Sequence, residues 1–320
     1  MTFVLLVAGV LGLWVGTQFA VGGAVRLSER FGLSEGFVGL AILALGTDLP
    51  EVVVAVGGSL QQLRGVDASG VIVGSALGSV IAQGSLVIGV AGLVTYLPVA
   101  PTMVRRDGAV LLLSVAAVAV VVWDRSVDQV EGAVLILAWG IYIANLFLGE
   151  RRRRPLEAEE LESIEAIKAH LPPPVEIALG LVIVTAGAHG VVTGAIGLAD
   201  SLGVSQTMLG VILIGAGTSL PELALSLRAA MEKRASMSVG NVIGSNIFDL
   251  LVPVGIAAVI HPLSVEAGTV SFDLPALAIL SAVLLFFLWR RRGVQRHEAL
   301  TLVVLYGTYA VLRIGAGLPS

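Results

Sequence analysis

Two matching hexapeptides carry the residues of this sequence best suited to chemistry. They read Gly-Thr-Asp-Leu-Pro-Glu at 46–51 and Gly-Thr-Ser-Leu-Pro-Glu at 217–222. Each lies in the middle of an apolar run, where proline removes an amide donor and leaves backbone carbonyls without helical partners. The glutamate follows directly, and an ionisable residue inside an apolar span marks a functional site by default. Such carbonyl and carboxylate oxygens bind hard cations, including Na+ and Ca2+.

The apolar run after each hexapeptide adds polar side chains at helical spacing. Ser79 and Gln83 stand four residues apart, as do Ser245 and Asp249, so each pair projects from one helix face. If the two copies face each other, their donors form one centre with the inventory of a Ca2+ site. The predicted members of this centre are Glu51, Glu222, Asp249, Ser79, Ser245, Thr47, Thr218 and Gln83, with Asp48 close by.

The amino-acid composition indicates that these motifs lie in a lipid bilayer and not in water. Hydrophobic residues make up 56% of the chain, charged residues 13%, and the mean hydropathy is +0.96. The apolar runs are continuous and about 20 residues long, as transmembrane helices require, and lack the alternation of barrel strands. The fold class is therefore an all-α polytopic membrane protein. Cysteine is absent and the four histidines form no zinc pattern, so disulfides, thiolate catalysis and soft-metal sites are excluded.

Apolar runs between charged or Pro/Gly-rich breaks predict ten transmembrane helices. The first half has spans at 2–25, 34–64, 68–96, 108–123 and 127–148. The second half has spans at 174–199, 205–231, 237–260, 271–289 and 297–316. Spans 2, 3, 7 and 8 contain the motifs and are expected to be interrupted. The first run is expected to be a retained helix and not a signal peptide, because it lacks a basic start and its counterpart recurs inside the chain.

The chain can be laid on itself at an offset of 171 residues, the separation of Thr47 and Thr218. After a five-residue surplus in the first copy the offset becomes 166, and 73–94 lies over 239–260. Each copy has five spans, and this odd number makes consecutive copies insert in opposite directions. The expected organisation is a first inverted repeat at 1–150, a cytoplasmic linker at 151–172 and a second inverted repeat at 173–320.

Basic residues predict the orientation. Of 19 Lys and Arg residues, all but Arg64, Arg125 and Arg313 fall on one face of the ten-span arrangement. The positive-inside rule places that face in the cytoplasm and both termini outside a multi-pass protein of the cell membrane. Acidic residues near span ends, including Asp107 and Asp273, are expected to be solvated.

The paired motifs resemble those of the cation/Ca2+ exchanger superfamily, most closely its prokaryotic sodium/calcium exchangers. GTSLPELALS from Gly217 and GNVIGSNIFDLL from Gly240 are similar to the second α-repeat of that family. GTDLPEVVVA from Gly46 and GSALGSVIAQG from Gly74 are similar to a diverged first α-repeat. The resemblance implies a fold in which two long tilted helices, the first and the sixth, slide against an eight-helix core that holds the ions.

The resemblance also implies roles for individual residues. Glu51 and Glu222 are the implied central Ca2+ ligands. The further side chains implied to share the Ca2+ and flanking Na+ sites are Thr47, Thr218, Ser219, Ser79, Ser245 and Asp249. The backbone carbonyls of Ala44 and Gly215 are the candidates that complete these sites. The chain departs from the family at Asp48, where a small hydroxyl residue is usual, and at Gln83, where Asn or Asp is usual. Because close carboxylates disfavour simultaneous ionisation, this fourth acid keeps proton coupling open.

These observations predict a secondary active antiporter that exchanges Ca2+ for Na+ by alternating access. It is expected to be no enzyme and to need no cofactor; Ca2+ and Na+ are its cargo, and H+ is an alternative counter-ion. Its surroundings are the lipid bilayer, with no nucleic acid and no obligatory protein partner evident. The alternatives are an H+/Ca2+ antiporter and an exchanger of another divalent cation such as Mg2+ or Mn2+. An intramembrane hydrolase would need an asymmetric nucleophile and base, and a channel is disfavoured because paired carboxylate motifs indicate occlusion.

Overall fold

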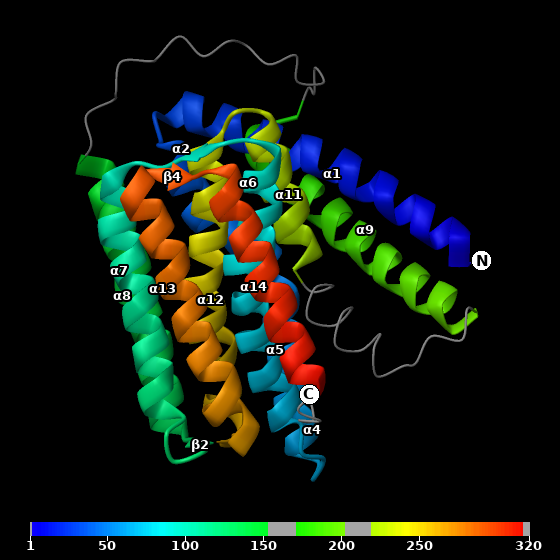
Figure 1. The fold of residues 1–320 in the computed structure, drawn as a ribbon, viewed down its shortest axis with the longest axis vertical. Helices are drawn as coiled ribbons and strands as arrows, with labels where there is room; N and C mark the ends of the chain where they lie inside the picture. The colour runs from blue at the N-terminus through cyan, green and yellow to red at the C-terminus, as the bar shows by residue number, and fades with distance from the viewer. Residues whose placement is uncertain (1, 153–170, 202–218, 316–320) are drawn as a thin grey trace.

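The structure is a computed structural model that describes residues 2–152, 171–201 and 219–315. Within these ranges the helices follow the predicted order of ten segments (Figure 1). The first half comprises α1 (Thr2–Phe31); a broken group of α2 (Glu35–Phe37), the π-helix η1 (Val38–Leu43), α3 (Ala44–Thr47) and α4 (Leu49–Gln62); α5 (Ser69–Ala82), the π-helix η2 (Gln83–Val87) and α6 (Ile88–Val94); α7 (Pro101–Val121); and α8 (Gln129–Arg152).

The second half repeats this order. It comprises α9 (Pro173–Ser201), α11 (Leu220–Met231), α12 (Ala235–Ile260), the π-helix η3 (Thr269–Asp273) with α13 (Leu274–Arg291), and α14 (Arg296–Gly315). Six described helical segments are long and apolar enough to cross a membrane, and the bent pair 35–47 and 49–62 makes a seventh. The chain is therefore a polytopic helical membrane protein, as predicted.

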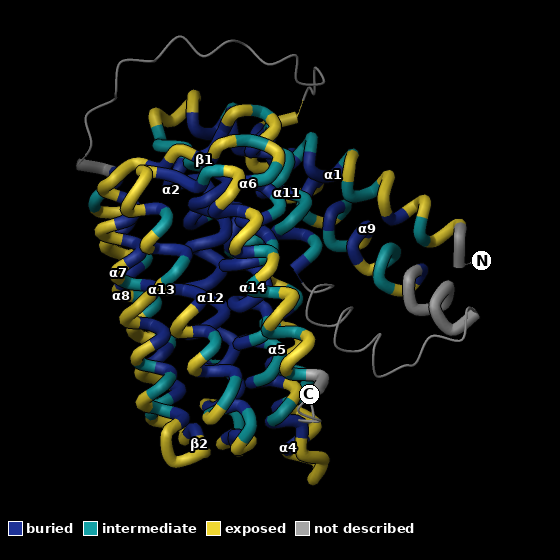
Figure 2. The backbone as a smooth tube through the Cα atoms, in the orientation of Figure 1, coloured by how far each residue is buried: buried dark blue, intermediate teal, exposed yellow. Residues whose placement is uncertain are grey.

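Two short strand pairs show the inverted relation of the halves. Strand β1 (Leu97–Pro98) pairs antiparallel with β4 (Gly293–Val294), and β2 (Ser126–Val127) pairs antiparallel with β3 (Leu263–Ser264). A shift of 166 residues carries β1 onto β3, and a shift of 167 carries β2 onto β4. Each pair is therefore the image of the other, and the two pairs lie at opposite ends of the helical bundle (Figures 1 and 2).

Helices α1 and α9 pack along each other beside the bundle formed by the other helices (Figure 1). Glycines bring the two backbones together: a Cβ on Gly16 would lie 2.8 Å from the carbonyl oxygen of Gly180, and one on Gly187 would lie 2.9 Å from that of Gly9. The two contacts are related by the 171-residue offset. Small residues allow such close approach between membrane helices. Because the two contacts are made by equivalent glycines of the two copies, the repeat itself provides this close packing.

Helix α12 forms the buried centre of the bundle and contacts α4, α5, α7, α8 and η1 (Figure 2). The predicted interruption of span 8 is wrong, because α12 runs unbroken from Ala235 to Ile260 with Pro253 inside it. Proline there removes only the donor for the Asp249 carbonyl, and packing on all sides supports the helix. The interruption of span 3 takes the form of the π-helical turn η2.

The expectation that Asp107 and Asp273 are solvated is also wrong. Asp107 has no exposed surface and accepts hydrogen bonds from Tyr142 (3.1 Å) and Arg106 (2.8 Å). Asp273 is 4% exposed and accepts one from Tyr309 (2.9 Å), with Arg313 at 3.0 Å. A buried carboxylate is tolerated when it is paired and hydrogen-bonded, and here these partners come from neighbouring turns and helices that sequence spacing did not connect.

Candidate cation site

The break in the second span places the first hexapeptide at the centre of the protein. Asp48 separates α3 from α4 with φ −86° and ψ 1°, and the two parts are bent by 40°. Pro50 has no amide hydrogen, so the carbonyl of Gly46 loses its helical donor. Ser219, at the equivalent position of the second copy, has nearly the same conformation, with φ −88° and ψ 7°.

Glu51 and Glu222 occupy equivalent positions of the two hexapeptides. Each lies in the first turn of a helix, Glu51 in α4 and Glu222 in α11. Unpaired amides make a helix N-terminus partially positive, which favours a carboxylate there. Both are buried, with 4% of Glu51 and none of Glu222 exposed. The two repeats thus each direct one glutamate into the protein interior.

A polar network links the segments that follow the broken helices. Gln83, the first residue of η2, donates from Nε2 to Oδ2 of Asp249 on α12 at 2.9 Å. The same Nε2 lies 3.3 Å from the Ser79 hydroxyl, which in turn lies 3.4 Å from the Ser219 hydroxyl. All four side chains are buried. This chain of contacts joins both repeats at one point and leaves Oδ1 of Asp249 unpaired.

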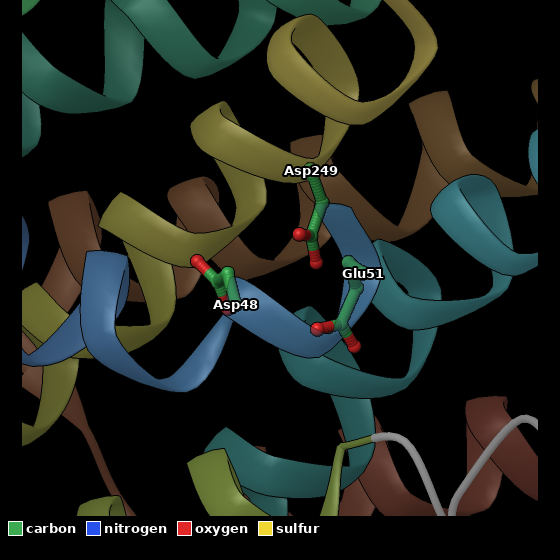
Figure 3. A group of neighbouring side chains, drawn as sticks. All are labelled: Asp48, Glu51 and Asp249. Atoms are coloured by element: carbon green, nitrogen blue, oxygen red, sulfur yellow. The ribbon is translucent and has the colours of Figure 1, made fainter. Parts of the chain in front are cut away.

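Three carboxylates gather on one side of this network. Asp48, Glu51 and Asp249 each offer an oxygen, and the three oxygens lie within 4.8 Å of one another. Figure 3 shows Asp249 extending from α12 toward the segment that carries Asp48 and Glu51. Glu222 lies beside Asp48 and Thr47. The cluster therefore contains four buried acids, two from each repeat.

Nothing in the described protein neutralises these acids. Both carboxylate oxygens of Asp48, Glu51 and Glu222 lack a hydrogen-bond partner, and no described basic side chain pairs with any of the four acids. Two unit charges about 5 Å apart repel by about 3 kcal/mol at an effective dielectric constant of about 20. Cations are the natural counterpart of such a cluster, because acceptor-only oxygens suit hard ions.

The structure brings most of the described members of the predicted site together. Thr47, Ser219, Ser79 and Gln83 are buried and lie next to the acids or to the network that reaches Asp249. Ser245 is buried one helical turn before Asp249 on α12. The Ser245 hydroxyl has no partner within the described residues. The predicted Ala44 carbonyl accepts hydrogen bonds from the Thr47 hydroxyl (3.1 Å) and the Asp48 amide (3.0 Å). Thr218 and Gly215 lie outside the described residues. The ligand roles themselves stay predictions.

Two buried asparagines of α12 differ in their contacts. Asn241 donates to the Ser226 hydroxyl on α11 at 3.1 Å, so it bridges two helices. Asn246 is 1% exposed, and neither atom of its amide has a partner among the described residues. Its amide nitrogen lies against Gly84 of η2. The sequence signal for Asn246 was present in the motif from Gly240, where Val80 is its counterpart in the first copy.

The described residues form ten helical segments in two inverted repeats around a buried acidic centre, an arrangement that defines a secondary transporter for cations. The profile of the sodium/calcium exchanger protein family matches residues 1–148 and 174–315. The chain therefore belongs to the sodium/calcium exchanger family, which supports cation/Ca2+ exchange as its class of activity.

Relatives of known name agree with this assignment. The chain is 27% identical to the sodium/calcium exchanger MaX1 of Methanosarcina acetivorans over 97% of each chain. It is 29% identical to the inner membrane protein YrbG of Escherichia coli over 90% of this chain and 88% of YrbG. It matches a solved structure of the sodium-calcium exchanger NCX_Mj with a TM-score of 0.80 at 28% identity, covering 100% of this chain and 99% of that chain. The resemblance inferred from the motifs is thus confirmed.

Proposed function

We propose that this protein exchanges Ca2+ for Na+ across the membrane by alternating access. The observation that carries the proposal is the group of four buried acids without a basic partner, supplied in equal number by the two repeats. Glu51 and Glu222 are the proposed central Ca2+ ligands. Asp48, Asp249 and the surrounding hydroxyl and amide oxygens share the Ca2+ and Na+ sites: Thr47, Ser79, Gln83, Thr218, Ser219 and Ser245.

The coupling of the two ion fluxes follows from the free-energy cost of occluding a site that holds no cation. Sealing uncompensated carboxylates away from water costs several kcal/mol per ion. The occluded state is therefore accessible only when Ca2+ or its counter-ions neutralise the acids, and the two fluxes become obligatorily linked without ATP. In this proposal one fixed site is exposed alternately to the two sides of the membrane.

The α1 and α9 pair is the proposed moving part. It contacts η1 and α3 of the first repeat and α11 of the second, which are the segments that carry or adjoin the broken hexapeptides. The pair lies beside the bundle and not within it (Figure 1). Sliding of this pair would therefore uncover the site without rearranging the network between Gln83 and Asp249.

The test is Ca2+ uptake into proteoliposomes. Vesicles preloaded with Na+ are compared with vesicles that carry only a pH gradient, using the wild-type protein and Glu222→Gln. We expect uptake that requires internal Na+ and is abolished by the substitution. Uptake driven by the pH gradient alone would contradict Na+ coupling, and absence of Ca2+ flux in both arms would contradict Ca2+ transport and direct the assay to Mg2+ and Mn2+.

Asp48 favours one alternative, an H+/Ca2+ antiporter. A fourth acid at the centre offers a group that a proton could neutralise in place of Na+. The arm with the pH gradient separates the two functions, because only the proton exchanger accumulates Ca2+ there.

We also propose that the basic face is cytoplasmic, with both termini outside, because Arg105 and Arg292 lie at one end of the bundle and few basic residues lie at the other. The native chain has no cysteine, so single cysteines report accessibility cleanly. Asp124→Cys is expected to react with an impermeant maleimide in intact cells, whereas Arg105→Cys is expected to react only after permeabilisation. The reverse pattern would invert the proposed orientation.

A further inference from the structure

A pocket with a volume of about 390 Å³ lies where α6 ends and α14 begins. Residues 92–96 form one wall, and Gln295 and Arg296 form the other. Leu93 and Val94 make the first wall apolar, and Arg296 is the only charged side chain among the lining residues. The volume is in the range of sites that bind small organic molecules. The pocket therefore offers a ligand an apolar wall and one cationic group.

The outer surface of α14 continues from the pocket along the bundle. Leu300 and Val304 follow Arg296 at intervals of four residues, so all three side chains project from one helix face. Leu300 is 53% exposed and Val304 is 57% exposed. In a bilayer such exposed apolar side chains contact lipid chains. This face of α14 thus has a cationic end and an apolar remainder, as the headgroup and acyl chain of an anionic phospholipid require.

Aromatic side chains place the pocket at the depth of the lipid headgroups. Tyr96 in its wall is 45% exposed, and Trp289 near the end of α13 is 65% exposed. Tyrosine and tryptophan are enriched where the bilayer meets water. The Tyr96 hydroxyl lies within hydrogen-bonding distance of the backbone carbonyls of Arg291 (3.0 Å) and Arg292 (3.2 Å) and donates to them. This contact holds the wall of the pocket against a loop that carries further arginines.

Four arginines stand within seven residues beside the pocket: Arg290, Arg291, Arg292 and Arg296. All four are exposed, and none forms an ion pair with a described residue. Membrane topology alone accounts for basic residues at this end, so the location of Arg296 in the pocket wall is what singles out a binding site. A guanidinium binds phosphate oxygens through two parallel hydrogen bonds.

The other copy has the same corner without these features. Gln129 is the counterpart of Arg296 at an offset of 167 residues, and Val259 is the counterpart of Leu93 at an offset of 166. There the Gln129 side chain donates to the Val259 carbonyl at 3.2 Å, so it joins the two helices directly. Segment 123–131 contains one arginine and three acids, whereas segment 289–298 contains four arginines and one acid. The inverted repeat therefore builds this corner at both ends of the bundle, and substitutions make only one of them basic.

We propose that the pocket between α6 and α14 binds an anionic glycerophospholipid. The lipid phosphate contacts Arg296, and an acyl chain lies along Leu300 and Val304. Basic pockets between membrane helices recognise anionic headgroups in this way. The inference goes beyond the proposed function and does not depend on which ions are exchanged.

The first test is lipid binding to the purified protein in a neutral detergent. Native mass spectrometry measures the apparent Kd for phosphatidylglycerol, with zwitterionic phosphatidylcholine as the comparison. We expect the wild-type protein to bind phosphatidylglycerol about fivefold more tightly or better, the contribution of one arginine near a headgroup. Arg296→Gln, which installs the residue of the other copy, is expected to remove this preference. Arg105→Gln removes an exposed arginine that does not line the pocket and is expected to retain it.

A second variant separates the pocket from the charge of the surface around it. Val94→Trp fills the pocket and leaves every arginine in place, and the 56% exposure of Val94 gives the larger side chain room at the surface. We expect this variant to lose the preference for phosphatidylglycerol as well. Val120→Trp, at a position of α7 that is 76% exposed, is the matched control and is expected to bind like the wild-type protein.

Four results would contradict the inference. They are equal affinity of the wild-type protein for the two lipids, equal losses in Arg296→Gln and Arg105→Gln, unchanged binding in Val94→Trp, and displacement of phosphatidylglycerol by soluble glycerol 3-phosphate. The last result would assign the pocket to a free anion. Thermal unfolding verifies that each variant is folded, and Na+-driven Ca2+ uptake reports separately whether the proposed function holds.

Discussion

The two copies of the ion-binding repeat share a backbone but place their second acid differently. In the first copy both acids, Asp48 and Glu51, lie on the broken helix, and Gln83 follows on the next segment. In the second copy Glu222 lies in the first turn of α11 and the other acid, Asp249, lies on α12. Gln83 and Asp249 are equivalent by the 166-residue offset, and they are hydrogen-bonded directly to each other.

This difference teaches that the repeat determines where oxygen donors lie, whereas individual substitutions determine where charge lies. The triad of Asp48, Glu51 and Asp249 forms on one side of the pseudo-symmetric centre, with no equivalent triad around Glu222 in the described residues. An inverted repeat can therefore present one geometry to both faces of the membrane while its charge remains asymmetric. Substitutions at shared and at differing positions distinguish which of these two properties governs transport.

The largest effect is expected for the position that the copies share. Glu51→Gln and Glu222→Gln each keep the side-chain shape and remove a buried charge, so each is expected to reduce Ca2+ flux by about 100-fold or more, equivalent to about 2.7 kcal/mol or more of lost ion stabilisation. Initial rates of 45Ca2+ uptake measure this, with the exposed Glu29→Gln as the matched control. A loss confined to one glutamate would break the functional equivalence of the copies.

A smaller effect is expected where the copies differ. Asp249→Asn removes a ligand charge and is expected to weaken apparent Ca2+ affinity by about 10- to 100-fold. Gln83→Ala removes a neutral oxygen of the proposed site and the hydrogen bond that orients Asp249 but no charge, and we expect about a tenfold loss. The Ca2+ dependence of uptake gives both values. Equal losses in the two variants would mean that the charge of Asp249 contributes no more than the neutral amide of Gln83.

The packing of α1 against α9 offers a third comparison of the copies, because equivalent glycines make equivalent contacts outside the ion site. A Cβ on Gly16 or Gly187 would meet backbone atoms of the opposite helix at 2.7 Å. Alanine at either position is expected to lower stability by about 1–3 kcal/mol through overpacking, by similar amounts at the two. Gly140→Ala is the control, because no heavy atom lies within 4 Å of the added methyl. Thermal unfolding in detergent measures the change, and a neutral result at Gly16 would refute the close packing.

The smallest effect is expected at the two tyrosines that hold buried acids. Tyr142 donates to Asp107, and Tyr309 donates to Asp273. Replacing either tyrosine by phenylalanine removes one hydrogen bond, while Arg106 or Arg313 still pairs with the acid, so the expected cost is about 0.5–1.5 kcal/mol. The same thermal assay compares the two. A destabilisation at only one tyrosine would show that the copies stabilise their acids by different means.

Much of the fold could be predicted because a bilayer leaves few alternatives. Span order, the inverted repeat and the burial of the hexapeptides follow from hydrophobic length, an odd number of spans per copy and proline chemistry. The continuity of α12 could not be predicted, because one proline in a helix is tolerated or disruptive according to the packing around it. The burial of Asp107 and Asp273 was missed for a similar reason: their tyrosine partners are 35 and 36 residues away along the chain.

For the site, the sequence by itself determined which donors exist and that two copies supply them, since residue types and a repeat offset are properties of the chain alone. Only the tertiary structure decided their grouping: Asp48 with Glu51 and Asp249, Glu222 beside Asp48, and Gln83 bonded to Asp249. The physical reason is that helical spacing specifies the face from which a side chain projects, whereas the distance between carboxylates on different helices depends on how those helices cross. The sequence specifies which residues are charged, and helix packing brings those charges together at one point.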